Sequence, residues 1–180
     1  MLHLQQIKSA GDILQEYRNT PIGELLEYQN LNKQFETPSK PRLLVGMCMD
    51  YRKKLNVPEK FAYIMRTGGA SLKGKEFNIA YAIGVGQIKY MVIIGHDHCG
   101  MSNIGVHRDE FIEGMVQHAG WTKETATGYF DKEVENFDIG EETEFTLKEV
   151  NRLRKLYPGI VIAPLFYFLN DNSLSQIIEP

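Results

Sequence analysis

Two short segments of the sequence combine residue types that bind and use a metal ion. Residues 48–52 read CMDYR and residues 96–100 read HDHCG, and together they hold both cysteines of the chain. Two thiolates and one imidazole are ligands that a catalytic zinc uses when it keeps a fourth position open for water. The spacing His96-x-x-Cys99 allows one turn to present two ligands, while Cys48 must arrive from elsewhere in the fold. The sequence therefore predicts a site for one Zn²⁺ per chain, formed by Cys48, His96 and Cys99.

Asp50 and Arg52 follow Cys48 at intervals of two residues and add acid–base chemistry to the predicted metal site. Asp50 is the natural candidate to occupy the fourth position on the metal or to face it. The planar guanidinium of Arg52 can pair with Asp50 and hold the carboxylate away from the metal. Gly100 allows close backbone approach, and we expect its amide to donate to a thiolate sulfur. At this point both roles of Asp50, metal ligand and partner of a bound water, stay open.

Both segments follow apolar runs that are typical of buried strands. Residues 42–47 (RLLVGM) lead into Cys48, and residues 90–94 (YMVII) lead through Gly95 into His96. A further run at residues 61–65 ends in the loop 66–70 (RTGGA). Helical patterns between these runs imply crossover connections and a mainly parallel sheet, in which the carboxyl ends of the strands share one edge. We therefore predict an α/β fold, with a mainly parallel central sheet flanked by helices and the metal site at that edge.

The remaining elements are predicted from the spacing of apolar residues. We expect an amino-terminal helical arm over residues 1–36, divided into two helices at Pro21 and Gly23. The next pattern predicts a helix with its apolar face at Phe77, Ala80, Tyr81 and Val85. For residues 105–144 we expect either helices or an excursion around a partner subunit. The last patterns predict an amphipathic helix at 145–156, a strand at 160–169 and a short edge strand at 174–178.

Composition limits the classes of protein that the sequence fits. The chain has 180 residues, of which 43% are hydrophobic and 24% charged, so we expect residues 1–180 to form one domain with one core. A net charge of −3 without a basic stripe predicts that nucleic acid is not a partner. The apolar runs are too short to cross a membrane, and residues 1–10 lack a secretory pattern. With no disulfide framework, these features predict a cytoplasmic protein.

The two cysteine segments resemble the signatures of the beta-class carbonic anhydrases, Cys-x-Asp-x-Arg and His-x-x-Cys with a following Gly. Residues 65–70 (MRTGGA) are similar to the Arg-Asn-Ala-Gly loop of that family, with Thr67 where the family usually carries Asn. Residues 157–171 look like the closing helix, strand and turn of the family. The resemblance covers most of the chain from about Arg42 onward and points to the compact branch of the family.

The resemblance implies a function and assigns roles to residues. It implies reversible, zinc-dependent hydration of carbon dioxide to bicarbonate and a proton, through zinc-bound hydroxide. Cys48, His96 and Cys99 would ligate zinc, and Asp50 and Arg52 would form the catalytic dyad. The family also implies a homodimer or a higher homo-oligomer. A small linear substrate needs little more than a dry pocket, and the residues expected to line it are Gly68, Gly69, Ala70 and Gly100.

Other functions fit parts of the sequence. Related zinc enzymes on this scaffold hydrolyse carbon disulfide or carbonyl sulfide, and the signatures do not separate these substrates from carbon dioxide. A non-catalytic zinc-binding module would result if Asp50 filled the fourth metal position permanently. Residues 69–75 (GASLKGK), from Gly69 to Lys75, match the Gly-x4-Gly-Lys pattern of a phosphate loop. Glu76 follows where that loop needs Ser or Thr, so nucleotide binding is the remote alternative.

Overall fold

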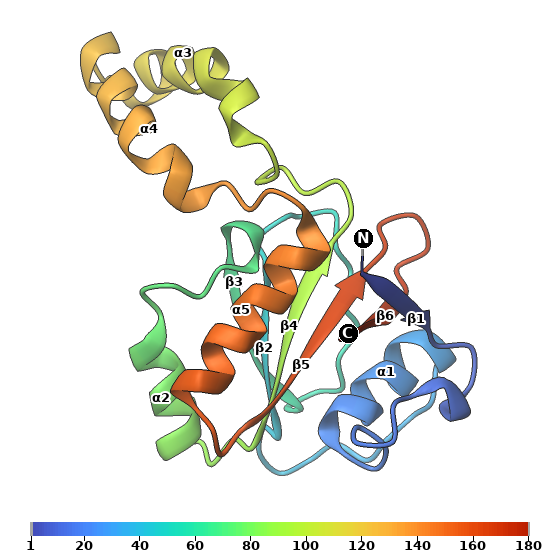
Figure 1. Cartoon of the computed structure of the whole chain (residues 1–180). Coiled ribbons are helices and arrows are strands. Elements are labelled where there is room, and N and C mark those ends of the chain that lie inside the picture. Colours follow the sequence, from blue (N-terminus) through green and yellow to red (C-terminus); the bar gives the residue numbers. More distant parts are fainter. Residues whose placement is uncertain (1, 180) are drawn as a thin grey trace.

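A computed structural model describes residues 2–179, which form a six-stranded sheet with helices on both faces (Figure 1). The strand order is β1-β6-β5-β4-β2-β3. The strands β3 (Ala62–Thr67), β2 (Leu43–Cys48), β4 (Tyr90–His96) and β5 (Val161–Tyr167) are parallel, whereas β6 (Leu174–Ile178) and β1 (His3–Gln6) pair antiparallel. The predicted α/β fold, with its mainly parallel sheet and flanking helices, is confirmed.

Side-chain alternation along the strands divides the core into two layers. In β2, Val45 and Met47 face helix α1 (Pro21–Leu31), on one side of the sheet. Leu44 points to the other side, where the helices α2 (Glu76–Gly84) and α5 (Glu142–Leu156) lie. Successive residues of a strand point to opposite faces, and here both faces are covered by helices. All six residues of β2 are consequently buried.

The prediction of an amino-terminal helical arm is wrong in part. Residues 3–6 form the edge strand β1 beside β6, and residues 10–12 form a short 3-10 turn. Among residues 2–36 the structure forms one α-helix, α1, whose side chains pack into the core. Thr20 caps α1 by accepting hydrogen bonds from the backbone N–H groups of Ile22 and Gly23. Proline is favoured at the first helical position, so Pro21 starts one helix instead of dividing two.

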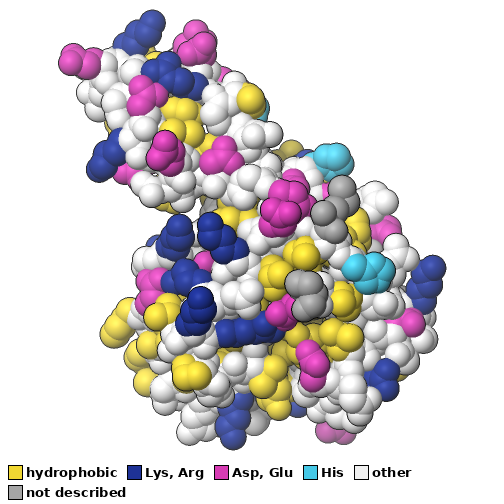
Figure 2. Space-filling model, in the orientation of Figure 1, with side chains coloured by type: hydrophobic (Ala, Val, Ile, Leu, Met, Phe, Trp, Pro, Cys, Tyr) yellow, Lys and Arg dark blue, Asp and Glu magenta, His cyan; other side chains and the backbone are white. Residues whose placement is uncertain are grey.

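The predicted apolar face of α2 is also wrong. Ile79 and Ala82 are the buried residues of this helix, whereas Phe77, Tyr81 and Val85 are 80%, 60% and 64% exposed. Hydrophobic side chains accordingly gather on the surface over α2 (Figure 2). A short helix with apolar residues on two sides offers two stripes of similar spacing, and only packing against the sheet selects one of them.

Residues 104–137 fold into a helical hairpin that projects from the sheet (Figure 1). The 3-10 turn Ile104–His107 leads into α3 (Arg108–Ala119), and α4 (Lys123–Phe137) returns antiparallel to it. Phe111 packs against Tyr129 and Phe130, with ring centroids 6.5 and 5.1 Å apart, which holds the two helices together. The expected helices of residues 105–144 are confirmed. Within residues 2–179, no helix combines the length and the apolar character needed to cross a bilayer.

Candidate metal centre

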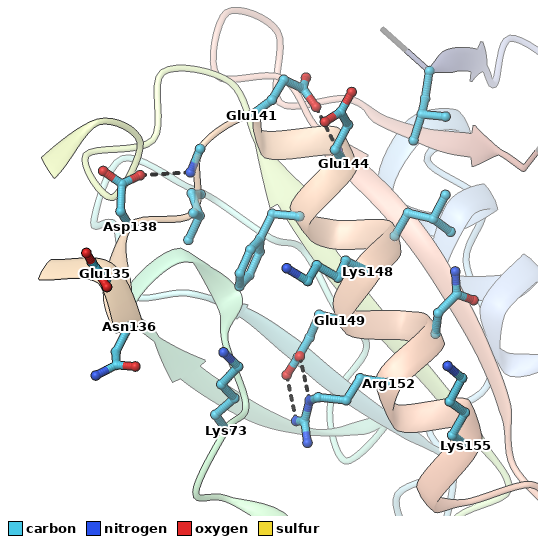
Figure 3. Close-up of a pocket in the computed structure, with 16 residues that line it drawn as sticks. Lys73, Glu135, Asn136, Asp138, Glu141, Glu144, Lys148, Glu149, Arg152 and Lys155 are labelled. Atoms are coloured by element: carbon cyan, nitrogen blue, oxygen red, sulfur yellow. Dashed lines mark hydrogen bonds and ion pairs between the residues drawn. The ribbon is translucent and has the colours of Figure 1, made fainter. Parts of the chain in front are cut away.

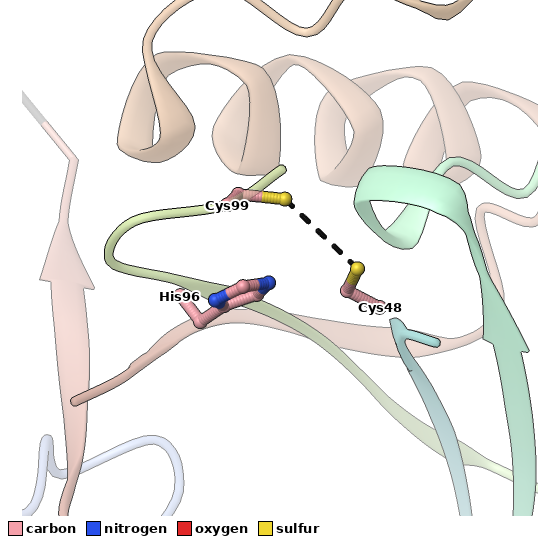
Figure 4. A group of neighbouring side chains, drawn as sticks. All are labelled: Cys48, His96 and Cys99. Carbon is pink, nitrogen blue, oxygen red and sulfur yellow. Dashed lines mark hydrogen bonds between the residues drawn. The ribbon is translucent and has the colours of Figure 1, made fainter. Parts of the chain in front are cut away.

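The three predicted ligands meet at the carboxyl edge of the sheet (Figure 4). Cys48 is the last residue of β2 and His96 is the last residue of β4, and these parallel strands are neighbours. Cys99 lies in the turn that leaves β4. The potential ligand atoms of the three residues lie within 4.8 Å of one another, and all three residues are buried. The sheet topology thus brings together the two segments that the sequence singles out.

His96 is held in the form that can bind a metal through Nε2. Its Nδ1 atom lies 2.8 Å from the backbone carbonyl oxygen of Asp97. Because a carbonyl oxygen can only accept, Nδ1 carries the proton and donates this hydrogen bond. Nε2 therefore keeps its lone pair, and it is buried without a hydrogen-bond partner in the described part of the chain. A metal ion would satisfy this nitrogen, so the residues present fit a metal site.

The thiols of Cys48 and Cys99 act as a pair. Their Sγ atoms are 3.9 Å apart. Two Zn–S bonds of about 2.3 Å at a tetrahedral angle span about 3.8 Å, so the spacing suits zinc. The hydrogen bond between the thiols lowers the pKa of Cys48 and raises the pKa of Cys99, since the two sulfurs share one proton. The backbone N–H of Met101 also lowers the pKa of Cys99. Donation from the Gly100 amide to a thiolate sulfur stays a prediction.

Asp50 and Arg52 form an ion pair beside this cluster. Nε of Arg52 lies 3.0 and 3.1 Å from the two carboxylate oxygens of Asp50, and the backbone N–H of Arg52 donates to Oδ1 at 2.9 Å. The guanidinium also donates to the carbonyl oxygen of His98 at 2.8 Å, which ties the pair to the turn that carries Cys99. The Arg52 side chain holds the pKa of Asp50 well below its ordinary value. Asp50 is thus an ionised carboxylate whose two oxygens are both engaged by Arg52.

Comparison with known proteins identifies the fold. No family model matches the sequence, and no curated protein matches it. Among solved structures, a beta-carbonic anhydrase from Trichomonas vaginalis matches with a TM-score of 0.66 over 84% of this chain and 91% of that chain, at 17% identity. The chain has the beta-carbonic anhydrase fold. Carbonic anhydrases from Glaciozyma antarctica and Streptococcus mutans match with TM-scores of 0.61 and 0.57, at 16% and 17% identity, over 92% of this chain and 100% of theirs.

In this beta-carbonic anhydrase fold, the glycine loop after β3 packs closely against the side chains of Met101 and Ile139. Residues Gly68–Ala70 form a 3-10 turn in which Gly69 has a φ of +60°. A Cβ atom at Gly69 would lie 2.5 Å from Cγ2 of Ile139, so glycine permits the linker before α5 to approach the loop. Gly100 instead lines an apolar cavity of about 370 Å³ whose other lining residues include Phe111 of α3 and Phe130 of α4. That Gly68, Gly69, Ala70 and Gly100 line a substrate pocket stays a prediction.

The segment Gly69–Lys75 lacks the geometry of a phosphate loop. Such a loop directs free backbone N–H groups at an anion. Here the N–H of Leu72 donates at 2.8 Å to Oε1 of Glu149, a buried carboxylate that Arg152 holds in place (Figure 3). A second anion beside Glu149 would be repelled. The structure therefore argues against the nucleotide-binding alternative.

Three further side chains near the centre carry buried polar atoms that the sequence did not predict. Nζ of Lys53, Oγ1 of Thr67 and Oγ of Ser102 have no hydrogen-bond partner within residues 2–179. Thr67 stands opposite Cys48 in the register of β2 and β3, and the N–H of Ser102 donates to the carbonyl oxygen of Cys99 at 3.0 Å. A lysine directly after Arg52 has the sequence signal of an exposed loop, so its burial could not be predicted.

Proposed function

We propose that this chain is a zinc-dependent carbonic anhydrase, which converts carbon dioxide and water into bicarbonate and a proton. The observation that carries the proposal is the buried cluster of Cys48, His96 and Cys99, with Nε2 of His96 free to bind, on a beta-carbonic anhydrase fold. These three residues would hold one Zn²⁺, because two thiolates and an imidazole suit a zinc with an open fourth position. When bound, zinc lowers the pKa of a coordinated water to about 7 and so supplies hydroxide at neutral pH.

Asp50 and Arg52 would direct the attack on carbon dioxide. An ionised carboxylate only accepts hydrogen bonds, so Asp50 would accept one from the attacking hydroxide and turn its lone pair toward the substrate carbon. Arg52 keeps Asp50 ionised and fixes its orientation through bonds to both oxygens. This pairing engages both carboxylate oxygens of Asp50 with Arg52. It therefore favours a catalytic centre over a module in which Asp50 closes the metal site.

We further propose that the functional unit is a homodimer. The strand β3 lies at the edge of the sheet, and its residues Tyr63 and Ile64 are each 42% exposed. Tyr63 lies near the end of α2, since a Cβ atom at Gly86 would be 3.0 Å from its ring. The exposed Phe77 and Tyr81 of α2 add to the apolar surface on this side. An open edge strand with apolar side chains favours association, and a second copy of the chain would cover it.

Metal analysis combined with a carbon dioxide hydration assay across pH tests the proposed reaction. We expect stoichiometric zinc in the wild type and loss of zinc in Cys48→Ser and His96→Ala. His107→Ala, at an exposed histidine of the hairpin, is the matched control and is expected to keep its zinc. Asp50→Asn is expected to keep zinc while hydration falls by about 10²-fold or more, because the hydrogen-bond acceptor is changed.

Two outcomes would contradict parts of this proposal. Wild-type protein without zinc would overturn the metal centre. Zinc without hydration at any pH would overturn the carbon dioxide reaction, and an assay with carbonyl sulfide or carbon disulfide would then test the related hydrolase activity.

A further inference from the structure

The buried ammonium group of Lys53 has no role in the reaction described so far. Lys53 is 4% exposed, and its Nζ atom lacks a hydrogen-bond partner in the part of the chain that the structure describes. The titratable and charged groups around it are Cys48 on β2, Asp50 in the following loop, Cys99 in the turn after β4 and Arg66 on β3. Burial lowers the pKa of Lys53, which means that its ammonium form needs a compensating anion. Lysine is almost never fully buried unless its charge is paired. A counter-charge is therefore needed near this group.

The charges of the centre leave the buried Lys53 ammonium in excess, while Arg66 is exposed and its charge is screened by solvent. Two thiolates would balance the two positive charges of a bound Zn²⁺. The carboxylate of Asp50 is already matched by Arg52, which donates to both of its oxygens. One more negative charge at the open position of the metal would compensate the Lys53 ammonium. Hydroxide and bicarbonate, the reactant and the product of the proposed reaction, both carry that charge.

We propose that Lys53 is a positioning residue that favours an anion at the open position of the metal centre, and this inference rests on the proposed function. Lys53 acts through its electric field, because its ammonium group makes no hydrogen bond to any of residues 2–179. Its charge favours an anionic occupant over neutral water. Two thiolates would neutralise the charge of the metal and so reduce its electrostatic attraction for hydroxide. The positive charge of Lys53 would compensate for this reduced attraction.

The variant Lys53→Met tests the inference, because methionine is similar in length and carries no charge. Two properties are measured: the pH profile of hydration by the zinc protein, and the affinity of the Co²⁺-substituted protein for azide, followed by visible absorption without turnover. We expect the midpoint of the pH profile to rise by about one unit and the azide Kd to rise about tenfold. The reason is that the variant removes a nearby positive charge that stabilises the anion. Lys53→Arg, which keeps the charge, is expected to restore both properties toward the wild type.

Lys54→Met is the matched control, since this neighbouring lysine is exposed and is expected to change neither property. Thermal unfolding distinguishes positioning from a structural role. Methionine needs no counter-charge, so Lys53→Met is expected to melt at the wild-type temperature or above it. If Lys53→Met does not fold, Lys53→Gln replaces it in both measurements.

An unchanged pH midpoint together with unchanged azide affinity would overturn the inference and leave the proposed function standing. An equal loss of azide affinity in Lys53→Arg would also overturn it, because the charge is then irrelevant. If the metal-loaded wild type does not hydrate carbon dioxide, the proposed function fails. The azide titration then decides by itself whether Lys53 favours an anion at the centre.

Discussion

Hydrogen bonds to single atoms decide the chemical form of each side chain in the metal centre. The carbonyl oxygen of Asp97 fixes the tautomer of His96, and Arg52 fixes the charge of Asp50. In both cases the fixing group is one or two residues away in the chain. The local backbone therefore prepares a neutral imidazole and an ionised carboxylate before any metal or substrate binds.

Arg52→Met is expected to raise the pKa of Asp50 toward its ordinary value of about 3.9. In the wild type this pKa is depressed, so the stability from the ion pair is present above the unfolded pKa and is lost as the pH falls through the folded pKa. An NMR titration of the Asp50 carboxyl carbon measures the change. Arg52→Lys keeps the positive charge but lacks the planar guanidinium, so the pKa of Asp50 in this variant is expected to lie between those of the wild type and Arg52→Met. The same midpoint in all three proteins would contradict the assigned cause.

At the scale of elements, β4 both supplies His96 and supports α5. Gly95 directly precedes the ligand, and a Cβ atom there would lie 2.1 Å from Oγ1 of Thr146 on α5. Thr146 is 1% exposed and its hydroxyl donates to the carbonyl oxygen of Glu142, so it has little freedom to move away. Glycine at position 95 therefore allows α5 to lie against the strand end that carries the ligand.

Gly95→Ala is expected to reduce the free energy of unfolding by about 1–3 kcal/mol, because the added methyl group overpacks this contact. Urea unfolding measures the loss, and the double variant Gly95→Ala/Thr146→Ala should recover part of it. Gly84→Ala is the control, since a Cβ atom there meets open space at the end of α2. A similar loss in both single variants would show that the α5 contact is not the cause.

At the scale of the whole molecule, the sheet has two edge strands, the short and partly polar β1 at one end and β3 at the other. The exposed apolar residues of β3 and α2 lie at the β3 edge, which is where the proposed homodimer would form. A charged residue on an edge strand opposes pairing with another chain.

Ile64→Lys is accordingly expected to convert a dimer into a monomer without loss of zinc. Size-exclusion chromatography with light scattering gives the mass, and metal analysis confirms the centre. Val161→Lys is the matched control, because Val161 is also 42% exposed but lies on β5, away from β3 in the strand order. A dimer that survives Ile64→Lys and dissociates in Val161→Lys would place the interface elsewhere.

Some features of this protein depend on distant partners and could not be predicted from the chain alone. The strand β1 has a short, partly polar sequence, and its pairing with β6 joins opposite ends of the chain. The core face of α2 was assigned wrongly because spacing does not tell which stripe of apolar residues meets the sheet. Lys53 is buried although its neighbours Arg52 and Lys54 are exposed.

The sequence by itself determined the residue types of the candidate centre and the strands that carry them. Cys48 and His96 each end an apolar run, and the βα pattern requires parallel strands whose ends share one edge. The tertiary structure alone decided how close the ligand atoms lie and that Lys53 is buried. The Asp50–Arg52 pair, which the spacing already suggested, and the tautomer of His96 are set by hydrogen bonds within two residues. The physical reason is that strand patterns and short-range hydrogen bonds are set locally, whereas distances between ligands and burial depend on contacts between segments far apart in the chain.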